Sequence, residues 1–467
     1  MTCLELGDPG AFAGIPLVLV NRCRAHGLSG ADTATGFSLD ARAEVAAGRL
    51  GLATRSGVGE LGAFAAPRVA IYSGKAIGYP YWAYYAHALL SIGLTFAPLS
   101  ATEVASGSLE RFDLLVMPGG FATWGLDRAE GLQGVDAAIR SFIERGGAMI
   151  GSCGGAFYAS EGRPGWLGAI DATPKFTQEY LLTGAAVLGI SITDRLLNKG
   201  LPEAIELPYY HGPIYSNADR TAATLGHFRN YVEESRLFID NPLDRGLFDR
   251  EIKQAPAILV AGAGKGKILA FSPHPEMGEF LRKGITFETY VRHFLPIRGH
   301  KVMDETLKFF MKEDCAGFRL IYNAIAYLGL FDAKATSLPA NGLETADAVE
   351  LLQVLANVDA AIHAMFDHLE KQAKAETAGM QTLLAAEFGR TRREWSDVLG
   401  GLRAECQGGP IDRALVHGLT TALTDAAKSL QSPLRLAENL VLTELPIRLS
   451  AAALRLIRCD RALETSL

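Results

Sequence analysis

The chain has 467 residues, of which 49% are hydrophobic and 21% are charged, and its formal net charge is −6. This composition is ordinary for a globular protein, and the length exceeds one typical hydrophobic core, so we expect two or three domains. A slightly acidic chain gives no reason to expect nucleic acid or an anionic membrane as its main partner.

Cysteine usage and the N-terminus indicate the compartment. The six cysteines lie far apart and form no CxxC pair: Cys3, Cys23, Cys153, Cys315, Cys406 and Cys459. This spacing argues against a disulfide scaffold and a structural zinc site, so we expect no metal. The N-terminus lacks the basic and apolar regions of a signal peptide, and no run approaches the ~20 apolar residues that cross a bilayer. We therefore expect a soluble cytoplasmic protein with reduced thiols.

The first 66 residues give the weakest pattern. An apolar run at 15–20 predicts a short strand, residues 39–50 predict a helix, and the remainder is rich in Gly, Ala and Ser. We expect an N-terminal extension over 1–66, either packed on the following domain or partly mobile.

Short apolar runs alternate with helical patterns from residue 67 onward. Strands are expected at 69–72, 95–99, 112–117, 148–152, 258–261 and 268–271. Helices are expected at 82–92, 135–145 and 280–294. The last two strands flank a glycine-rich turn and predict a closing β-hairpin. The alternation is typical of a doubly wound, mostly parallel sheet, so we expect an α/β domain over 67–297.

Beyond residue 300 the sequence indicates helices only. In the run 346–374, apolar residues alternate spacings of four and three: Leu351, Leu355, Val358, Ile362, Met365 and Leu369. This period is typical of a bundle or coiled-coil seam. Similar runs cover 380–405, 411–430 and 433–463. We expect a connecting helical segment at 298–340 and an all-α helical bundle at 341–467.

The motif with the most chemical content is Gly-Ser-Cys-Gly-Gly at 151–155, between a predicted strand and a predicted helix. A G-x-C-x-G sequence at such a junction is typical of a nucleophile elbow, whose small flanking residues permit a sharp, strained turn. The helix N-terminus, a nearby imidazole and backbone N–H groups would activate the thiol of Cys153. The alternative is a buried structural thiol beside glycines that serve packing.

A second motif, Ser-Pro-His-Pro-Glu at 272–276, follows the last strand of the hairpin. His274 would act as the base and Glu276 would orient its imidazole, as covalent catalysis requires. In isolation this motif would indicate only a loop histidine beside a solvated glutamate.

A third motif, Met-Pro-Gly-Gly at 117–120, follows another strand. It would aim the N–H of Gly120 or Phe121 at an oxyanion, and Gly154 would supply the second N–H.

These motifs, in this order, resemble the class I glutamine amidotransferase superfamily. Within it the chain looks most like the biotin-protein ligase N-terminal (BPL_N-like) domain, on the residues VAIYSG at 69–74, GGAFYAS at 154–160 and PYYHGPIY at 208–215. The resemblance covers about half of the chain. It implies a flavodoxin-like fold in which Cys153, His274 and Glu276 form a triad that works through a thioester.

The sequence departs from the glutaminase pattern after the elbow. A glutamine that helps to bind substrate usually follows there, whereas this chain has Ala156 and Phe157. The related peptidase branch usually has His directly after the nucleophile, where this chain has Gly154. The resemblance therefore implies an amide substrate without naming it, and catalytic turnover stays open.

Aromatic residues near 210 are candidates for the substrate pocket. Tyr209, Tyr210, His211 and Tyr215 lie close together in the sequence. His211 has two interpretations of equal weight, a pocket residue or a hydrogen-bonded loop histidine.

No cofactor is expected. The GxGxxG at 57–62 is followed too soon by Pro67 to open a nucleotide-binding helix, and the glycine-rich stretch at 262–267 is better explained as a hairpin turn. The Gly/Arg-rich adenylate loop of a biotin ligase is absent from the sequence, so biotinylation is not expected.

Three functional hypotheses follow from the sequence. The first is a cysteine-dependent hydrolase or transferase that acts on the C–N bond of a small-molecule or peptide-like amide. The second is a non-catalytic binding or regulatory module that signals through the C-terminal helices. The third is a scaffold in which residues 300–467 hold the function and the α/β domain is an oligomerisation platform. In the first hypothesis, the C-terminal helices would mediate self-association or bind a protein partner.

Overall fold

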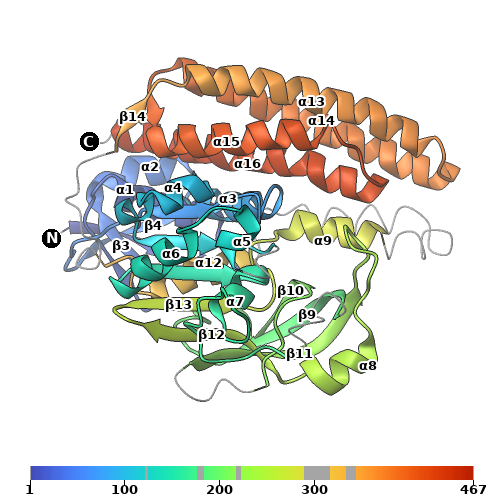
Figure 1. Cartoon of the computed structure of the whole chain (residues 1–467). Coiled ribbons are helices and arrows are strands. Elements are labelled where there is room, and N and C mark those ends of the chain that lie inside the picture. The colour runs from blue at the N-terminus through green and yellow to red at the C-terminus, as the bar shows by residue number, and fades with distance from the viewer. Residues whose placement is uncertain are drawn as a thin grey trace.

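The computed structural model describes residues 2–120, 125–175, 183–216, 222–288, 316–332 and 343–465. Figure 1 shows an α/β body with a layer of long helices along one side and a small N-terminal unit at one end. Phe121, most of the expected connecting segment and the end of the helix expected at 280–294 lie outside the described residues.

A nine-stranded sheet forms the centre of the molecule, in the order β10-β9-β11-β12-β13-β8-β7-β5-β6. The parallel half contains β5 (Val69–Tyr72), β6 (Phe96–Leu99), β7 (Leu114–Met117), β8 (Ala148–Ser152) and β13 (Gly266–Phe271). The antiparallel half adds β9 (Ala185–Ile192), β10 (Ala204–Tyr210), β11 (Ala223–Glu234) and β12 (Pro256–Ala263). The parallel strands β5, β7 and β8 are buried along their whole length, as strands covered on both faces must be.

Helices cover this sheet, and the α/β prediction is confirmed. They are α3 (Tyr81–Ser91), α4 (Ala101–Ala105), α5 (Leu126–Glu130), α6 (Val135–Glu144), α7 (Gly154–Ala159), α8 (Arg245–Leu247), α9 (Glu279–Thr286) and α12 (Ala316–Tyr327). The helix α3 lies between strand β5 and the C-terminal helices, which explains why nearly all of its residues are buried. The predicted hairpin is β12 and β13, paired antiparallel.

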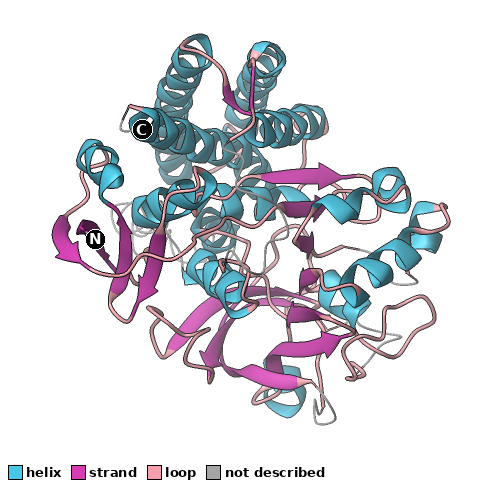
Figure 2. Cartoon of the chain, turned by 90° about the vertical axis from the view of Figure 1, so that its left-hand side faces the viewer, coloured by secondary structure: helices cyan, strands magenta, loops and turns pink. Residues whose placement is uncertain are grey.

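The N-terminal segment differs from its expected structure. It forms a four-stranded sheet in the order β2-β3-β1-β4, from β1 (Thr2–Gly7), β2 (Gly30–Thr33), β3 (Gly36–Asp40) and β4 (Thr54–Val58). Figure 2 shows this small sheet beside the large one, with the bundle above. Residues 15–20 lie in a helix, α1 (Gly14–Ala25), and the helix expected from 39 begins only at α2 (Glu44–Arg49). A short apolar run cannot distinguish a strand from a helix that is buried on most sides, and α1 is such a helix.

Buried ion pairs hold α1 against the C-terminal helices. The Arg22 guanidinium donates to both carboxylate oxygens of Asp460, at 2.7 and 2.9 Å, and to Asp412 at 2.8 Å. His26 Nε2 lies 3.0 Å from the same Asp460 carboxylate. The N-terminal segment is therefore packed on the rest of the molecule rather than detached from it.

Four long helices form the C-terminal bundle, which confirms the predicted helical region. They are α13 (Val349–Ala373), α14 (Ala378–Gln407), α15 (Arg413–Ser429) and α16 (Leu436–Glu464), with a short β14–β15 pair (Thr345–Ala346, Ile411–Asp412) at one end. All six residues of the predicted seam in α13 are buried. Among the described residues, α13 is the one helix long and apolar enough to span a bilayer by length and composition. Because α13 packs against the other three bundle helices, and a bundle core helix passes the same test, this is weak evidence for a membrane.

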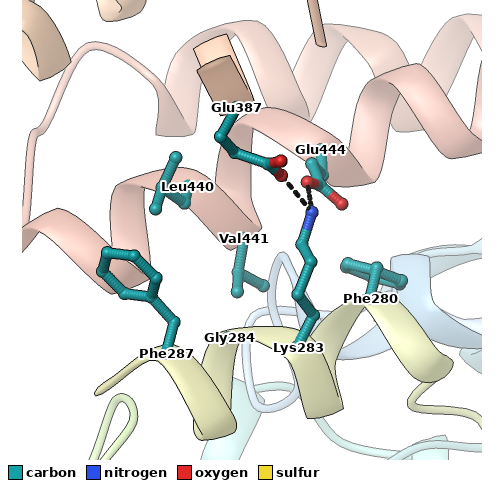
Figure 3. A pocket seen from close by; sticks show the side chains of 8 residues that line it. All are labelled: Phe280, Lys283, Gly284, Phe287, Glu387, Leu440, Val441 and Glu444. Carbon is teal, nitrogen blue, oxygen red and sulfur yellow. Dashed lines mark hydrogen bonds and ion pairs between the residues drawn. The ribbon is translucent and has the colours of Figure 1, made fainter. Parts of the chain in front are cut away.

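A buried charge cluster joins the bundle to α9 (Figure 3). The Lys283 ammonium from α9 donates to Glu387 of α14 at 2.6 Å and to Glu444 of α16. Burial would raise the pKa of Glu387, but the charges of Lys283 and Arg390 hold it below its usual value. Since α9 directly follows the 272–276 motif, this cluster fixes the bundle relative to the candidate site.

Candidate functional site

Cys153 occupies a strained turn between β8 and α7. It stands at the N-cap of α7 with φ 49° and ψ −106°, a conformation that non-glycine residues rarely adopt. The glycines around it allow the close approach of neighbouring backbone: a Cβ on Gly154 would lie 2.3 Å from the carbonyl oxygen of Gly120, and one on Gly155 would lie 2.1 Å from that of Met117. These contacts explain the small residues of the motif, and the turn has the form of the predicted elbow.

His274 and Glu276 form a buried hydrogen-bonded pair. The distance between His274 Nδ1 and Glu276 Oε1 is 2.6 Å, and both residues are almost fully buried. The Ser152 hydroxyl donates to the same Oε1 at 2.9 Å, and the His274 backbone N–H donates to the Pro208 carbonyl at 2.8 Å. Because Nδ1 carries the proton that the carboxylate accepts, Nε2 of a neutral ring is free to accept one.

The thiol and the imidazole are neighbours. A Cβ on Gly119 would lie 2.7 Å from His274 Cε1 and 3.4 Å from the Cys153 Cβ, so both side chains border this one glycine. In the conformation observed, the Cys153 Sγ donates to the Tyr210 carbonyl at 3.0 Å, and His274 Nε2 makes no hydrogen bond with any described residue. A rotation of the Cys153 side chain would therefore break the hydrogen bond to the Tyr210 carbonyl and turn the thiol toward His274.

The electrostatics of His274 favour its charged form. Burial alone would lower the pKa of His274, but the negative charges of Glu276 and of a Cys153 thiolate raise it to about 10. A proton taken from the thiol would thus be held on the imidazole, as in a thiolate–imidazolium pair.

Two of the three predicted oxyanion donors lie side by side. A Cβ on Gly154 would lie 2.7 Å from the backbone nitrogen of Gly120, directly next to the elbow. The third, Phe121, lies outside the described residues. Backbone N–H groups at the start of a helix are suited to a developing negative charge.

Cys153 and His274 open into one cavity with about 80 Å³ of free volume. Its described lining residues are Pro80, Tyr81, Tyr84, Gly120, Cys153, Tyr210, His211, Phe238, Ile239, His274 and Met277. His211 lies in the left-handed region with φ 55°, and its Nδ1 accepts the Gly184 backbone N–H at 2.9 Å. The same ring is therefore both anchored and part of the wall, which combines the two interpretations drawn from the sequence.

Two of the predicted pocket tyrosines lie elsewhere. Tyr209 packs on Phe228 and donates to the Gly212 carbonyl at 2.8 Å, and Tyr215 shares a 2.8 Å hydrogen bond with the Ser160 hydroxyl. Neither is among the lining residues. Tyr209 precedes Tyr210 on β10, and neighbouring side chains of a strand point to opposite faces.

Sequence reasoning missed several groups of the site. Tyr81 and Tyr84 enter the wall from the first turns of α3, where an aromatic cluster after strand β5 was an available signal. Phe238 and Ile239 come from a loop whose position depends on contacts distant in the sequence, and no local signal indicates them. The described residues contain no group of three or more His, Cys, Asp and Glu side chains arranged to hold a metal.

The α/β sheet with a sharp turn at the end of β8 is similar to the arrangement expected of a class I glutamine-amidotransferase-like domain. Residues 99–163 match the family model described as "Biotin-protein ligase, N terminal", and this match supports the same relationship. The matched segment runs from the last residue of β6 to just beyond α7 and contains Gly120 and Cys153. His274 and Glu276 lie beyond it.

Solved structures with a similar arrangement include two glutamine amidotransferases. One is 19% identical, with 45% of this chain and 90% of that chain covered and a TM-score of 0.30. Another, from Thermotoga maritima, is 13% identical, with 56% and 97% covered and a TM-score of 0.35. A β-galactosidase from Bacillus circulans sp. alkalophilus is 14% identical, with 44% and 28% covered and a TM-score of 0.27. No curated protein matches the sequence.

Proposed function

We propose that this protein is a cysteine-dependent, amidotransferase-like hydrolase or transferase that acts on a C–N bond of an amide. Cys153 is the nucleophile, His274 the base and Glu276 the group that orients the imidazole. The observation that carries the proposal is the strained Cys153 turn bordering a buried His274–Glu276 pair with a 2.6 Å contact between Nδ1 and Oε1. Cys153 and His274 line one cavity.

The first step forms a thioester. His274 Nε2 takes the proton of Cys153, the thiolate attacks the amide carbon, and a carbon–sulfur bond forms while negative charge develops on the oxygen. The N–H groups of Gly120 and Gly154 stabilise that charge. The carbon–nitrogen bond then breaks as the imidazolium gives its proton to the leaving nitrogen, which departs as ammonia or an amine.

The second step releases the acyl group. Water, or an acceptor amine in a transferase, gives its proton to His274 and attacks the thioester. The acid or the new amide is released, and the sulfur recovers its proton. Throughout, Ser152 and the Pro208 carbonyl hold the Glu276–His274 pair in place, and we regard Ser152 as a positioning residue.

Turnover of a panel of primary and secondary amides tests the proposal. We expect product release by the wild-type protein and none by Cys153→Ala. The matched control is Cys406→Ala, because Cys406 is a buried cysteine of the bundle that makes no contact with the cavity. Equal turnover by wild type and Cys153→Ala would contradict the proposal.

A second candidate is a non-catalytic ligand-binding module. The observation that favours it is the hydrogen bond from Sγ to the Tyr210 carbonyl, which directs the thiol away from His274 Nε2. It predicts that cavity ligands bind without any turnover that depends on Cys153.

We further propose that the C-terminal helices position the domain or mediate assembly with a second copy or a protein partner. Measurement of the solution mass by light scattering, with and without candidate partners, tests this part. A monomer at all concentrations would contradict self-association.

A further inference from the structure

The wall of the Cys153 cavity is apolar and aromatic. Apart from the thiol, its described lining consists of rings, aliphatic groups, one glycine and two histidines. None of these residues is an aspartate, glutamate, lysine or arginine. The described part of the wall therefore offers no charged partner for the two charged ends of an amino acid.

Glutamine carries an α-ammonium and an α-carboxylate, and each charge needs a partner when it leaves water. Glu276 is not among the described lining residues, and its Oε1 already accepts hydrogen bonds from His274 and Ser152. The histidines offer no substitute for a paired salt bridge, because His274 is required at the sulfur and His211 Nδ1 is occupied by the Gly184 N–H.

We infer that the cavity receives a small, uncharged, apolar acyl group, so that the substrate is a short-chain acyl amide rather than glutamine. This inference rests on the proposed function and specifies its substrate class. A cavity of about 150 Å³ holds benzene, or about 25 Å³ per carbon. The 80 Å³ beside Cys153 thus corresponds to roughly three or four carbons by the same ratio.

The cavity wall has a defined shape because the bundle holds it. Phe238 has φ 64°, which is strained for an aromatic residue, and its backbone N–H donates to Glu438 of α16 at 2.9 Å. Arg435, the N-cap residue of the same helix, donates to the Arg236 carbonyl at 2.8 Å. A wall fixed in this way selects acyl groups by size, since it cannot retreat without breaking these contacts.

Hydrolysis of three aminocoumarin amides with one common leaving group tests the inference. The acyl groups are butyryl, γ-glutamyl and octanoyl. We expect kcat/KM for the butyryl amide to exceed that of each other amide at least about tenfold, the discrimination that one or two misfitting groups give in an apolar pocket. A γ-glutamyl or octanoyl preference would overturn the inference and leave the proposed function standing.

A positive charge placed in the wall should reduce the preference for the butyryl amide over the γ-glutamyl amide. Ile239 is only half-buried, so Ile239→Arg can be accommodated and would provide a partner for a carboxylate. We expect the ratio of butyryl to γ-glutamyl kcat/KM to fall at least about tenfold in this variant. Ile15→Arg, at a 36% exposed position of α1, is the matched control and should keep the wild-type ratio. An unchanged ratio in folded Ile239→Arg would contradict the inference.

Protection of Cys153 from iodoacetamide separates failure of the inference from failure of the proposed function. Butyramide should slow alkylation and glutamine should not. Protection by butyramide without hydrolysis of any amide would support the acyl pocket and overturn catalysis. Protection by glutamine alone would overturn the acyl pocket.

Discussion

Replacing His274 with glutamine removes the group that would hold the Cys153 proton but keeps a side chain of similar length. The imidazole is almost fully buried, and its pKa is raised to about 10 by the charges of Glu276 and a Cys153 thiolate. Attraction between a thiolate and an imidazolium is mutual, so the substitution should slow the reactions in which the Cys153 sulfur gives up its proton.

The size of this effect follows from Coulomb's law. Two unit charges about 4 Å apart attract by about 4 kcal/mol at an effective dielectric constant of 20, and by about 1 kcal/mol in bulk water. Cys153 is half-buried, so its environment lies between these limits. A loss of about 1.4 kcal/mol or more of this attraction slows a reaction that depends on it at least tenfold. We therefore expect alkylation of Cys153 at pH 7 to be at least about tenfold slower in His274→Gln.

The rate is measured by quenched reaction with iodoacetamide and peptide mass spectrometry, which assigns the label to Cys153 rather than to the buried thiols. His363→Gln is the matched control, because His363 is exposed on α13 and should leave the rate unchanged. Equal rates in wild type and His274→Gln would refute the proposed thiolate–imidazolium pair.

Three further predictions concern stability. Lys283→Met removes one of the cations that the buried carboxylates of Glu387 and Glu444 share, while Arg390 stays in contact with both, and should reduce the free energy of unfolding by about 1.5–3 kcal/mol in urea titrations. Lys428→Met, at an exposed pair, should cost less than about 1 kcal/mol. The pKa of Glu387 is lower in the folded state than in the unfolded state, so its carboxylate stabilises the fold fully above about pH 4.3. This contribution is lost as the pH falls further. The free energy of unfolding should therefore decrease more in wild type than in Glu387→Gln between pH 6 and pH 3. Gly154→Ala places a Cβ 2.3 Å from a backbone carbonyl oxygen and should lower the melting temperature and reduce turnover, whereas Gly400→Ala, with open space around it, should not. Equal melting temperatures for the two alanine variants would contradict the close packing at the elbow.

The parts of the fold that the sequence predicts are those with a strong local signal. β5 and β8 are recognisable because strands buried on both faces are continuous apolar runs, and the seam of α13 is recognisable because its period repeats over several turns. The run at 15–20 is misread because burial of α1 on most sides removes the periodicity that would identify it as a helix.

The candidate site divides in the same way. Cys153, His274 and Glu276 stand in motifs with recognisable neighbours, so their proximity follows from the order of the strands. The cavity wall cannot be predicted in this way, because the position of Phe238 depends on a hydrogen bond to Glu438, 200 residues away in the sequence. Tyr209 and Tyr215 show that aromatic residues close to a site in the sequence need not line its pocket, because such residues also serve to pack the core.

The existence of an acyl-enzyme is the most direct test of the central claim. Intact mass measurement after rapid quenching of the protein with a butyryl amide should show one added butyryl group, and peptide mapping should place it on Cys153 as a thioester that hydroxylamine removes. The account predicts this adduct in wild type and its absence in Cys153→Ala. Amide turnover without any adduct on Cys153, or with the adduct on another residue, would contradict it.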